Sequence, residues 1–166
     1  MKRIKPVKPI KHENLAVFVG RFQPFHTGHL SIVTEILSEY DRMILVIGSA
    51  EKYGTEENPW TLQEREAIIR ASLSLDIQER IDIVWLDDTA DDDVWCENLI
   101  QILQHWTFNI EHVTLFTGNE WVRSICEKHG IHTHWIENYA VDISGTRIRQ
   151  MMKNGDDVTP WTVVMG

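Results

Sequence analysis

The sequence alternates short apolar runs with amphipathic helical patterns, and this alternation limits the folds that the chain can adopt. The apolar runs lie at residues 15–19, 43–48, 81–86, 113–117 and 132–136. The helical patterns lie at about residues 27–40, 61–73, 93–106, 120–129 and 144–153. Because most runs lack regular polar–apolar alternation, they are predicted to be strands covered on both faces. Strands and helices in this order form right-handed βαβ units, which place the strands in one parallel sheet.

The expected fold class is therefore α/β: a single domain with a Rossmann-like, doubly wound parallel sheet of about five strands. Residues 1–13 are polar and basic and contain Pro6 and Pro9, so they are predicted to be a flexible lead-in. The domain itself is predicted to span residues 14–166.

Charge and composition exclude several classes of protein. The chain has 16 Lys and Arg against 25 Asp and Glu, a formal net charge of −9. A general nucleic-acid coat or a membrane-surface binder needs a basic face, so neither partner is expected. The sequence has no run long enough to span a membrane and no signal-peptide core, and its two cysteines lack metal-ligand spacing. We therefore expect a reduced, cytoplasmic protein.

The most informative segment is Gly-Arg-Phe-Gln-Pro-Phe-His-Thr-Gly-His, residues 20–29, which joins the first predicted strand to the first helix. Ligands of such sheets bind beyond the carboxyl ends of strands, and helix N-termini bind phosphate. His26 and His29 are three residues apart, so they are expected on the same side of the first helical turn, with Gly28 keeping the surface between them low. Two imidazoles there can hydrogen-bond phosphate oxygens. Positive charge on them would stabilise a transition state that gains negative charge.

A second phosphate-binding pattern is Ile-Ser-Gly-Thr-Arg-Ile-Arg, residues 143–149. Ser144 and Thr146 suit a helix N-terminus on local grounds alone, so capping is one explanation for them. Thr146 and Arg149 are also three residues apart, beside the positive end of a helix. Hydroxyls, amides and a guanidinium that converge in this way can clamp a polyphosphate.

These segments resemble the signatures of the nucleotidyltransferase superfamily that carries the His-x-Gly-His motif. Arg-Phe-Gln-Pro-Phe at 21–25, Asn-Pro-Trp-Thr at 58–61 and the Glu-Arg pair at 64–65 are similar, more narrowly, to nicotinamide-nucleotide adenylyltransferases of the archaeal type. They are also similar to the matching domain of bacterial fusions with a Nudix hydrolase. The resemblance covers residues 15–152, and a chain of this length is not expected to contain the Nudix half.

The resemblance implies transfer of AMP from ATP to nicotinamide mononucleotide, giving NAD and pyrophosphate by in-line attack on the α-phosphorus. Mg²⁺ would arrive with ATP, and no protein-bound metal site is expected. The implied catalytic residues are His26, His29 and Arg149. The implied ATP-binding residues are Gly20, Arg21, Phe22, Gly28, Ser144, Thr146 and Arg149. The implied nicotinamide-nucleotide-binding residues are Arg65, Trp95, Asp92 and Asn119.

Several of these assignments have competing structural explanations. The acidic run at 87–93 is expected to be a solvated loop whose last residue, Asp93, caps the next helix. Relatives often have Asn where this chain has Asp92, and a carboxylate there would favour the nicotinamide nucleotide over its acid analogue. His132 and His134 share one face of a strand and are expected at the surface rather than on a metal.

Two other functions remain open on the sequence alone. One is another nucleotidyltransferase of the same superfamily, such as a phosphopantetheine adenylyltransferase. The other is a nucleotide-sensing module that binds ATP or NAD without turnover. Many archaeal-type relatives form homo-oligomers, so the resemblance implies that a homo-oligomer is one possibility for this chain.

Overall fold

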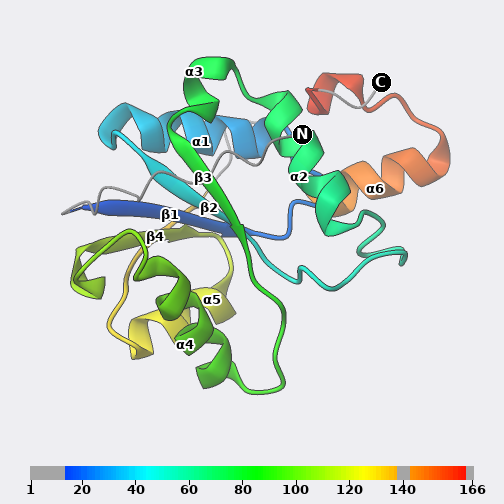
Figure 1. Cartoon of the computed structure of the whole chain (residues 1–166). Coiled ribbons are helices and arrows are strands. Elements are labelled where there is room, and N and C mark those ends of the chain that lie inside the picture. The colour runs from blue at the N-terminus through cyan, green and yellow to red at the C-terminus, as the bar shows by residue number, and fades with distance from the viewer. Residues whose placement is uncertain (1–13, 138–142, 164–166) are drawn as a thin grey trace, which may run out of the picture.

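The computed structural model describes residues 14–137 and 143–163, and its centre is a five-stranded sheet (Figure 1). The strands are β1 (Leu15–Gly20), β2 (Met43–Ile47), β3 (Ile81–Trp85), β4 (Val113–Thr117) and β5 (His132–Trp135). They lie in the order β3-β2-β1-β4-β5, and each neighbouring pair is parallel. The predicted fold class is confirmed. Strand order reverses between β1 and β4, which is where such sheets bind their ligands.

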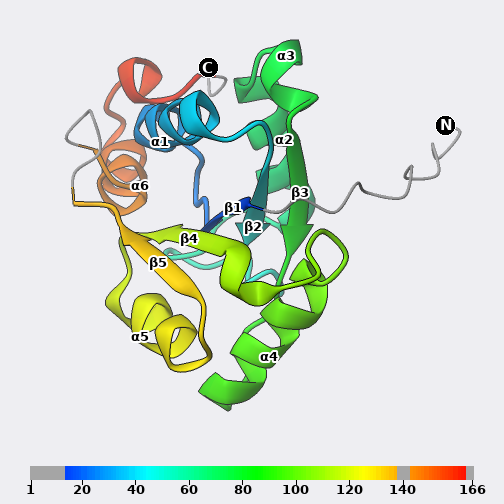
Figure 2. The same ribbon diagram turned by 90° about the vertical axis from the view of Figure 1, so that its left-hand side faces the viewer.

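Helices cover both faces of the sheet. Figure 2 shows α1 and α6 on one side of the sheet and α4 and α5 on the other. The five predicted helices are present as α1 (Thr27–Glu39), α2 (Leu62–Ser72), α4 (Asp92–Leu103), α5 (Glu120–Lys128) and α6 (Gly145–Asn154). Three short helices were not predicted: α3 (Leu75–Gln78), η1 (Ile110–His112) and η2 (Thr159–Trp161). No helix in the described part of the chain is both long and apolar enough to cross a membrane.

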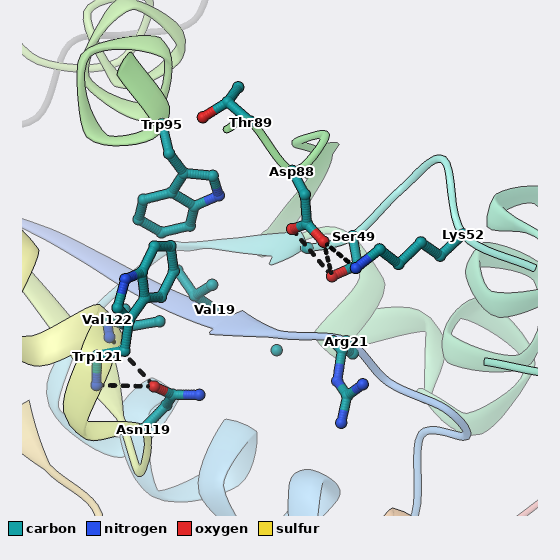
Figure 3. Close-up of a pocket in the computed structure, with 12 residues that line it drawn as sticks. Val19, Arg21, Ser49, Lys52, Asp88, Thr89, Trp95, Asn119, Trp121 and Val122 are labelled. Carbon is teal, nitrogen blue, oxygen red and sulfur yellow. Dashed lines mark hydrogen bonds and ion pairs between the residues drawn. The ribbon is translucent and has the colours of Figure 1, made fainter. Parts of the chain in front are cut away.

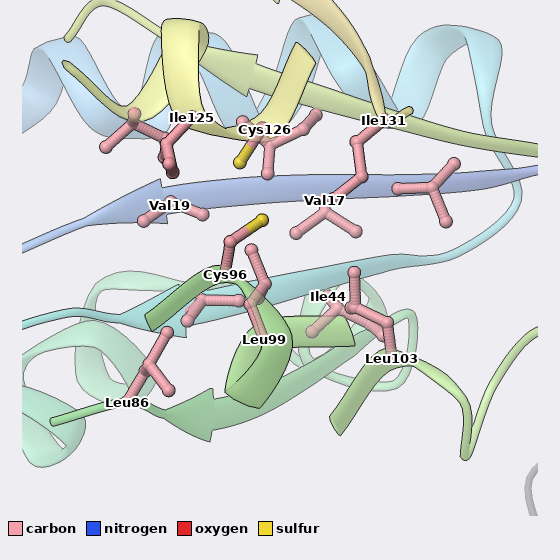
Figure 4. Packing of buried hydrophobic residues seen from close by; sticks show 14 of the residues in the cluster. Val17, Val19, Ile44, Leu86, Cys96, Leu99, Leu103, Ile125, Cys126 and Ile131 are labelled. Carbon is pink, nitrogen blue, oxygen red and sulfur yellow. The ribbon is translucent and has the colours of Figure 1, made fainter. Parts of the chain in front are cut away.

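The central strand β1 explains why the apolar runs do not alternate. Val17 and Val19 point into the core formed with α4 and α5, whereas Ala16 and Phe18 point into the core formed with α1 and α2. Successive side chains of a strand face opposite sides of the sheet, so a strand with two covered faces is apolar throughout. Figure 4 shows the α4/α5 side, where Cys96 and Cys126 lie as free thiols among aliphatic side chains.

The cap of α4 differs from the prediction. Asp91, not Asp93, is the N-cap, and its carboxylate accepts from the backbone N–H of Val94. Asp93 lies in the first turn and instead bonds Lys128 at 2.8 Å and His129 at 2.9 Å, which joins α4 to α5. In a run of aspartates every residue can cap, and only the backbone turn decides which one does. The predicted lead-in, residues 1–13, lies outside the described residues.

Candidate active site

A pocket of about 470 Å³ opens beyond the carboxyl ends of β1 and β2 (Figure 3). Gly20 lines it, and a Cβ added there would lie 2.8 Å from the buried Phe22 ring, so a larger residue would displace that ring. One wall is aromatic: Trp95 from α4 and Trp121 from α5 have ring centroids 4.8 Å apart. An aromatic wall beside a bare backbone suits a flat, electron-poor ring.

The opposite wall of this pocket is polar and was not identified from the sequence. The Ser49 hydroxyl donates to the Asp88 carboxylate at 2.9 Å, and the Lys52 ammonium pairs with the same carboxylate at 2.8 Å. The Asp88 hydrogen bond and charge raise the pKa of Lys52. Arg21 lies below this cluster and supplies a second cation to the pocket (Figure 3). Arg21 was predicted, whereas Ser49, Lys52 and Asp88 were not; they follow the ends of β2 and β3, and that position is the signal that could have found them.

At the N-terminus of α1, two histidines cap the helix reciprocally. His26 is the N-cap, and its Nδ1 accepts from the backbone N–H groups of Gly28 at 3.1 Å and His29 at 3.3 Å. In return, Nδ1 of His29 accepts from the backbone N–H of His26 at 3.1 Å. The two rings stack with centroids 3.6 Å apart. This is a capping box built from imidazoles, so the motif also starts the helix that positions it.

The same hydrogen bonds fix the protonation state of both rings. An Nδ1 that accepts a hydrogen bond carries no proton, so the proton of each neutral ring is on Nε2. His26 is only 1% exposed and His29 9%, and burial lowers the pKa of His26 to about 4. Burial, and then the neighbouring His26, lower the pKa of His29 well below its usual value. Of the two contributions considered for this pair, hydrogen bonding and positive charge, the lowered pKa values favour the first: both imidazoles are neutral N–H donors at pH 7.

Aromatic side chains pack against His29 of this pair. The ring centroids of Phe22 and Phe25 lie 4.8 and 5.4 Å from that of His29. Phe22 has a φ of 51°, a left-handed conformation that is unusual for a residue with a side chain. Its ring is buried in the core, so only its backbone can serve the predicted contact with ATP.

The N-terminus of α6 brings the second motif to the same region. The Ser144 hydroxyl caps the helix by accepting from the Arg147 N–H at 3.1 Å. The Arg149 guanidinium donates to the Gln23 carbonyl at 2.7 Å and to the Thr146 hydroxyl at 3.2 Å. Burial lowers the pKa of Arg149, and the charge of Arg21 adds to this effect. The predicted clamp residues thus lie together, next to the histidine loop.

The resemblance implied that Arg65 either contacts a substrate phosphate or helps to position the nucleotides. Its side chain is fully buried, at 0% exposure, which fits the second of these roles. Its guanidinium donates to the backbone carbonyls of Arg21, Gly48, Ser49, Ala50, Lys52 and Thr61. Through these bonds the guanidinium holds the loop that follows β1 against the loop that follows β2, and both loops line the pocket. In this structure Arg65 positions the site rather than lining it.

The remaining predicted residues divide between the pocket and the surface. Asn119 lines the pocket, and its side-chain oxygen caps α5 by accepting from the N–H groups of Trp121 and Val122. Asp92 is exposed on the first turn of α4 and is not among the residues that line the pocket. Its predicted contact with the carboxamide stays a prediction. Within the described ranges, no three His, Cys, Asp or Glu side chains gather closely enough to hold a metal ion.

The chain matches the cytidylyltransferase-like family over residues 17–151. It is 36% identical over 143 residues to a nicotinamide-nucleotide adenylyltransferase of Methanococcus maripaludis, covering 84% of this chain and 78% of that protein. It is 30% identical over 148 residues to the protein of the same name from Archaeoglobus fulgidus, covering 86% and 82%.

Solved structures agree with the fold. A bifunctional NMN adenylyltransferase/ADP ribose pyrophosphatase from Francisella tularensis matches 90% of this chain with a TM-score of 0.77 and 23% identity. This chain spans 45% of the length of that bifunctional protein. At that level of identity the likeness concerns the fold alone.

Proposed function

The chain belongs to the cytidylyltransferase-like family, among its nicotinamide-nucleotide adenylyltransferases, and we infer from this that it makes NAD by adenylyl transfer. AMP passes from ATP to nicotinamide mononucleotide, and pyrophosphate is released. The observation that carries this inference is that the loop with the histidine pair bonds the α6 clamp, through the Gln23 carbonyl and Arg149, while Arg21 of the same loop lines the pocket with the tryptophan wall.

The reaction requires no covalent bond between the protein and the substrates. A phosphate oxygen of the mononucleotide attacks the α-phosphorus of ATP, and the bond from that phosphorus to the bridging oxygen breaks in line. The electron pair leaves with pyrophosphate, so no covalent intermediate forms on the enzyme. Catalysis of such a step comes from aligning two anions and stabilising charge on the phosphate oxygens.

The triphosphate belongs, in this proposal, between α1 and α6. The Nε2–H groups of His26 and His29 donate to phosphate oxygens as neutral hydrogen-bond donors. Arg149 supplies the full positive charge, and Thr146 with the α6 N-terminus completes the clamp. Mg²⁺ bound to ATP would neutralise part of the phosphate charge.

The mononucleotide belongs in the 470 Å³ pocket. Its pyridinium ring lies against Trp95 and Trp121, since indole faces attract cationic rings. Its phosphate faces Arg21, which lines the same pocket at the side of the histidine loop. Preference for the amide over the acid nucleotide, a cytoplasmic location and assembly into homo-oligomers are further parts of the proposal.

A substrate panel tests this function. Purified protein is incubated with ATP, Mg²⁺ and one acceptor: nicotinamide mononucleotide, its acid analogue, phosphopantetheine or flavin mononucleotide. NAD and pyrophosphate are expected in equal amounts with the first acceptor, and His29→Ala is the matched inactive control. An adenylylated product from phosphopantetheine alone would reject the acceptor. ATP binding without any product would identify a sensor instead.

A further inference from the structure

Gln23 belongs to the first motif, residues 20–29, and none of the roles described so far is assigned to it. It is 3% exposed in the connection from β1 to α1, directly after Phe22 with its left-handed backbone. Its carboxamide forms two hydrogen bonds with one residue: Nε2 donates to the Trp60 carbonyl at 2.9 Å, and Oε1 accepts from the Trp60 N–H at 3.0 Å. We call this pair of bonds the Gln23 clasp. It fastens the β1–α1 loop to the segment that leads into α2.

The main chain of the same residue holds the α6 arginine. The Gln23 carbonyl accepts from Nη1 of Arg149 at 2.7 Å. Gly145 also approaches both partners closely, because a Cβ added to it would lie 3.1 Å from this carbonyl oxygen and 3.1 Å from Arg149 Nη1. A larger residue at 145 would have to displace one of the two partners. The position of the Gln23 carbonyl therefore sets where the guanidinium lies over the N-terminus of α6.

That carbonyl lies on a loop that needs outside support. A non-glycine residue in the left-handed region, as Phe22 is, persists only where surrounding contacts hold it. Support comes from the α2 side: the clasp fixes Gln23, and buried Arg65 donates to the Arg21 carbonyl at 3.1 Å. Arg21 in turn donates to Asn58 at 3.4 Å. Of these contacts, the clasp is the one that acts on the residue touching Arg149.

We propose that Gln23 is a positioning residue for phosphate transfer: the Trp60 clasp fixes its carbonyl, and that carbonyl orients Arg149 toward the ATP phosphates. The proposal rests on the inferred function, since it gives a role to Arg149 in binding the triphosphate. It assigns the glutamine of the first motif a task separate from ligand contact. A misplacement of about 1 Å in a reacting group can lower a rate about 100-fold, so a loosened guanidinium has a large effect.

The test compares Gln23→Met with a matched control, Thr107→Val. Methionine keeps the shape of glutamine and removes both bonds of the clasp. Thr107 is 2% exposed, and its hydroxyl donates to the Asn109 carbonyl at 3.0 Å and accepts from the Asn109 N–H at 3.2 Å. It therefore also holds one residue's backbone with two bonds, ahead of β4 at the other end of the sheet.

Both variants are expected to lose stability, but only one should lose activity. Gln23→Met should lower kcat/KM for ATP about 10- to 100-fold, with KM for the mononucleotide within about twofold of the wild type. Thr107→Val should keep both constants. Equal kcat/KM values for ATP in the two variants would overturn the proposal. Failure of the inferred function is distinguishable, because the wild type and Thr107→Val would then also make no NAD.

A double-mutant cycle with Arg149→Ala shows whether Gln23 acts through the arginine. If it does, adding Gln23→Met to Arg149→Ala changes turnover by less than about twofold, since the group it positions is already gone. If the loss of turnover in the double variant equals the product of the two single losses, Gln23 acts independently of Arg149 and the proposal is overturned.

Discussion

Two pairs of histidines, His26 with His29 and His132 with His134, have opposite environments. His26 and His29 lie at the N-terminus of α1, buried, stacked on each other and bonded through Nδ1 to backbone N–H groups. His132 and His134 lie on the edge strand β5, and both are exposed. A histidine takes its charge and tautomer from its surroundings, so the same residue type serves different ends.

The difference shows how the first pair can work. Backbone N–H groups occupy both Nδ1 atoms, so each buried ring can only donate through Nε2. Such a pair offers phosphate oxygens directed hydrogen bonds without bringing charge to a buried place.

The largest effect expected is on turnover when one buried ring is removed. His29→Ala deletes a donor that the proposed function assigns to the phosphates, and loss of one such donor lowers kcat about 100- to 1,000-fold. ATP affinity should change far less, because Arg149 and the α6 N-terminus remain. Steady-state kinetics and calorimetric ATP binding measure the two. A turnover close to that of the wild type would remove His29 from the catalytic machinery.

The second largest effect is expected on stability. It comes from comparing a buried arginine, Arg65, with an exposed one, Arg70. Arg65→Met leaves several buried carbonyls without a donor, and each costs about 1 to 3 kcal/mol, so unfolding should become easier by at least about 3 kcal/mol. Arg70→Met is the control, since Arg70 is exposed and its guanidinium pairs with Glu66 on the same helix. That change should cost less than about 0.5 kcal/mol. Urea unfolding measures both, and equal losses would contradict the positioning role.

The next largest effect is the loss of folding stability at acid pH. The pKa of His26 is lowered in the folded chain to about 4, so the unfolded chain binds more protons between that pH and its ordinary value of 6.5. Stability from this group is therefore complete above pH 6.5 and is lost as pH falls toward 4. His26→Asn keeps a good N-cap that does not titrate, and should lose less stability on acidification. An equal acid sensitivity in the two proteins would contradict a buried, neutral His26.

The smallest effect belongs to the exposed pair. Changing His132 and His134 together to alanine should shift the free energy of unfolding by less than about 0.5 kcal/mol and leave turnover unchanged. Thermal unfolding and the NAD assay measure this. A large loss of turnover would show that β5 carries a part of the site, which would end the contrast between the pairs.

The sequence was sufficient for the sheet, the principal helices and the two motifs, since buried strands and caps such as Thr61 have strong local patterns. It could not reveal that Arg65 is buried, because its acceptors are carbonyls from loops far apart in the chain. Nor could it give the charge of His26 and His29, since backbone N–H groups of a particular turn set it. Spacing predicts which residues are neighbours, whereas burial and backbone partners decide what each can do.

The central claim is that His26 and His29 act as neutral donors through Nε2. Long-range ¹H–¹⁵N correlation of the imidazole nitrogens at pH 7 tests it directly, with each of the two histidines assigned by substitution. For both rings the account predicts an unprotonated Nδ1 and a protonated Nε2. Two protonated nitrogens on either ring at that pH, or a proton on Nδ1 alone, would contradict it.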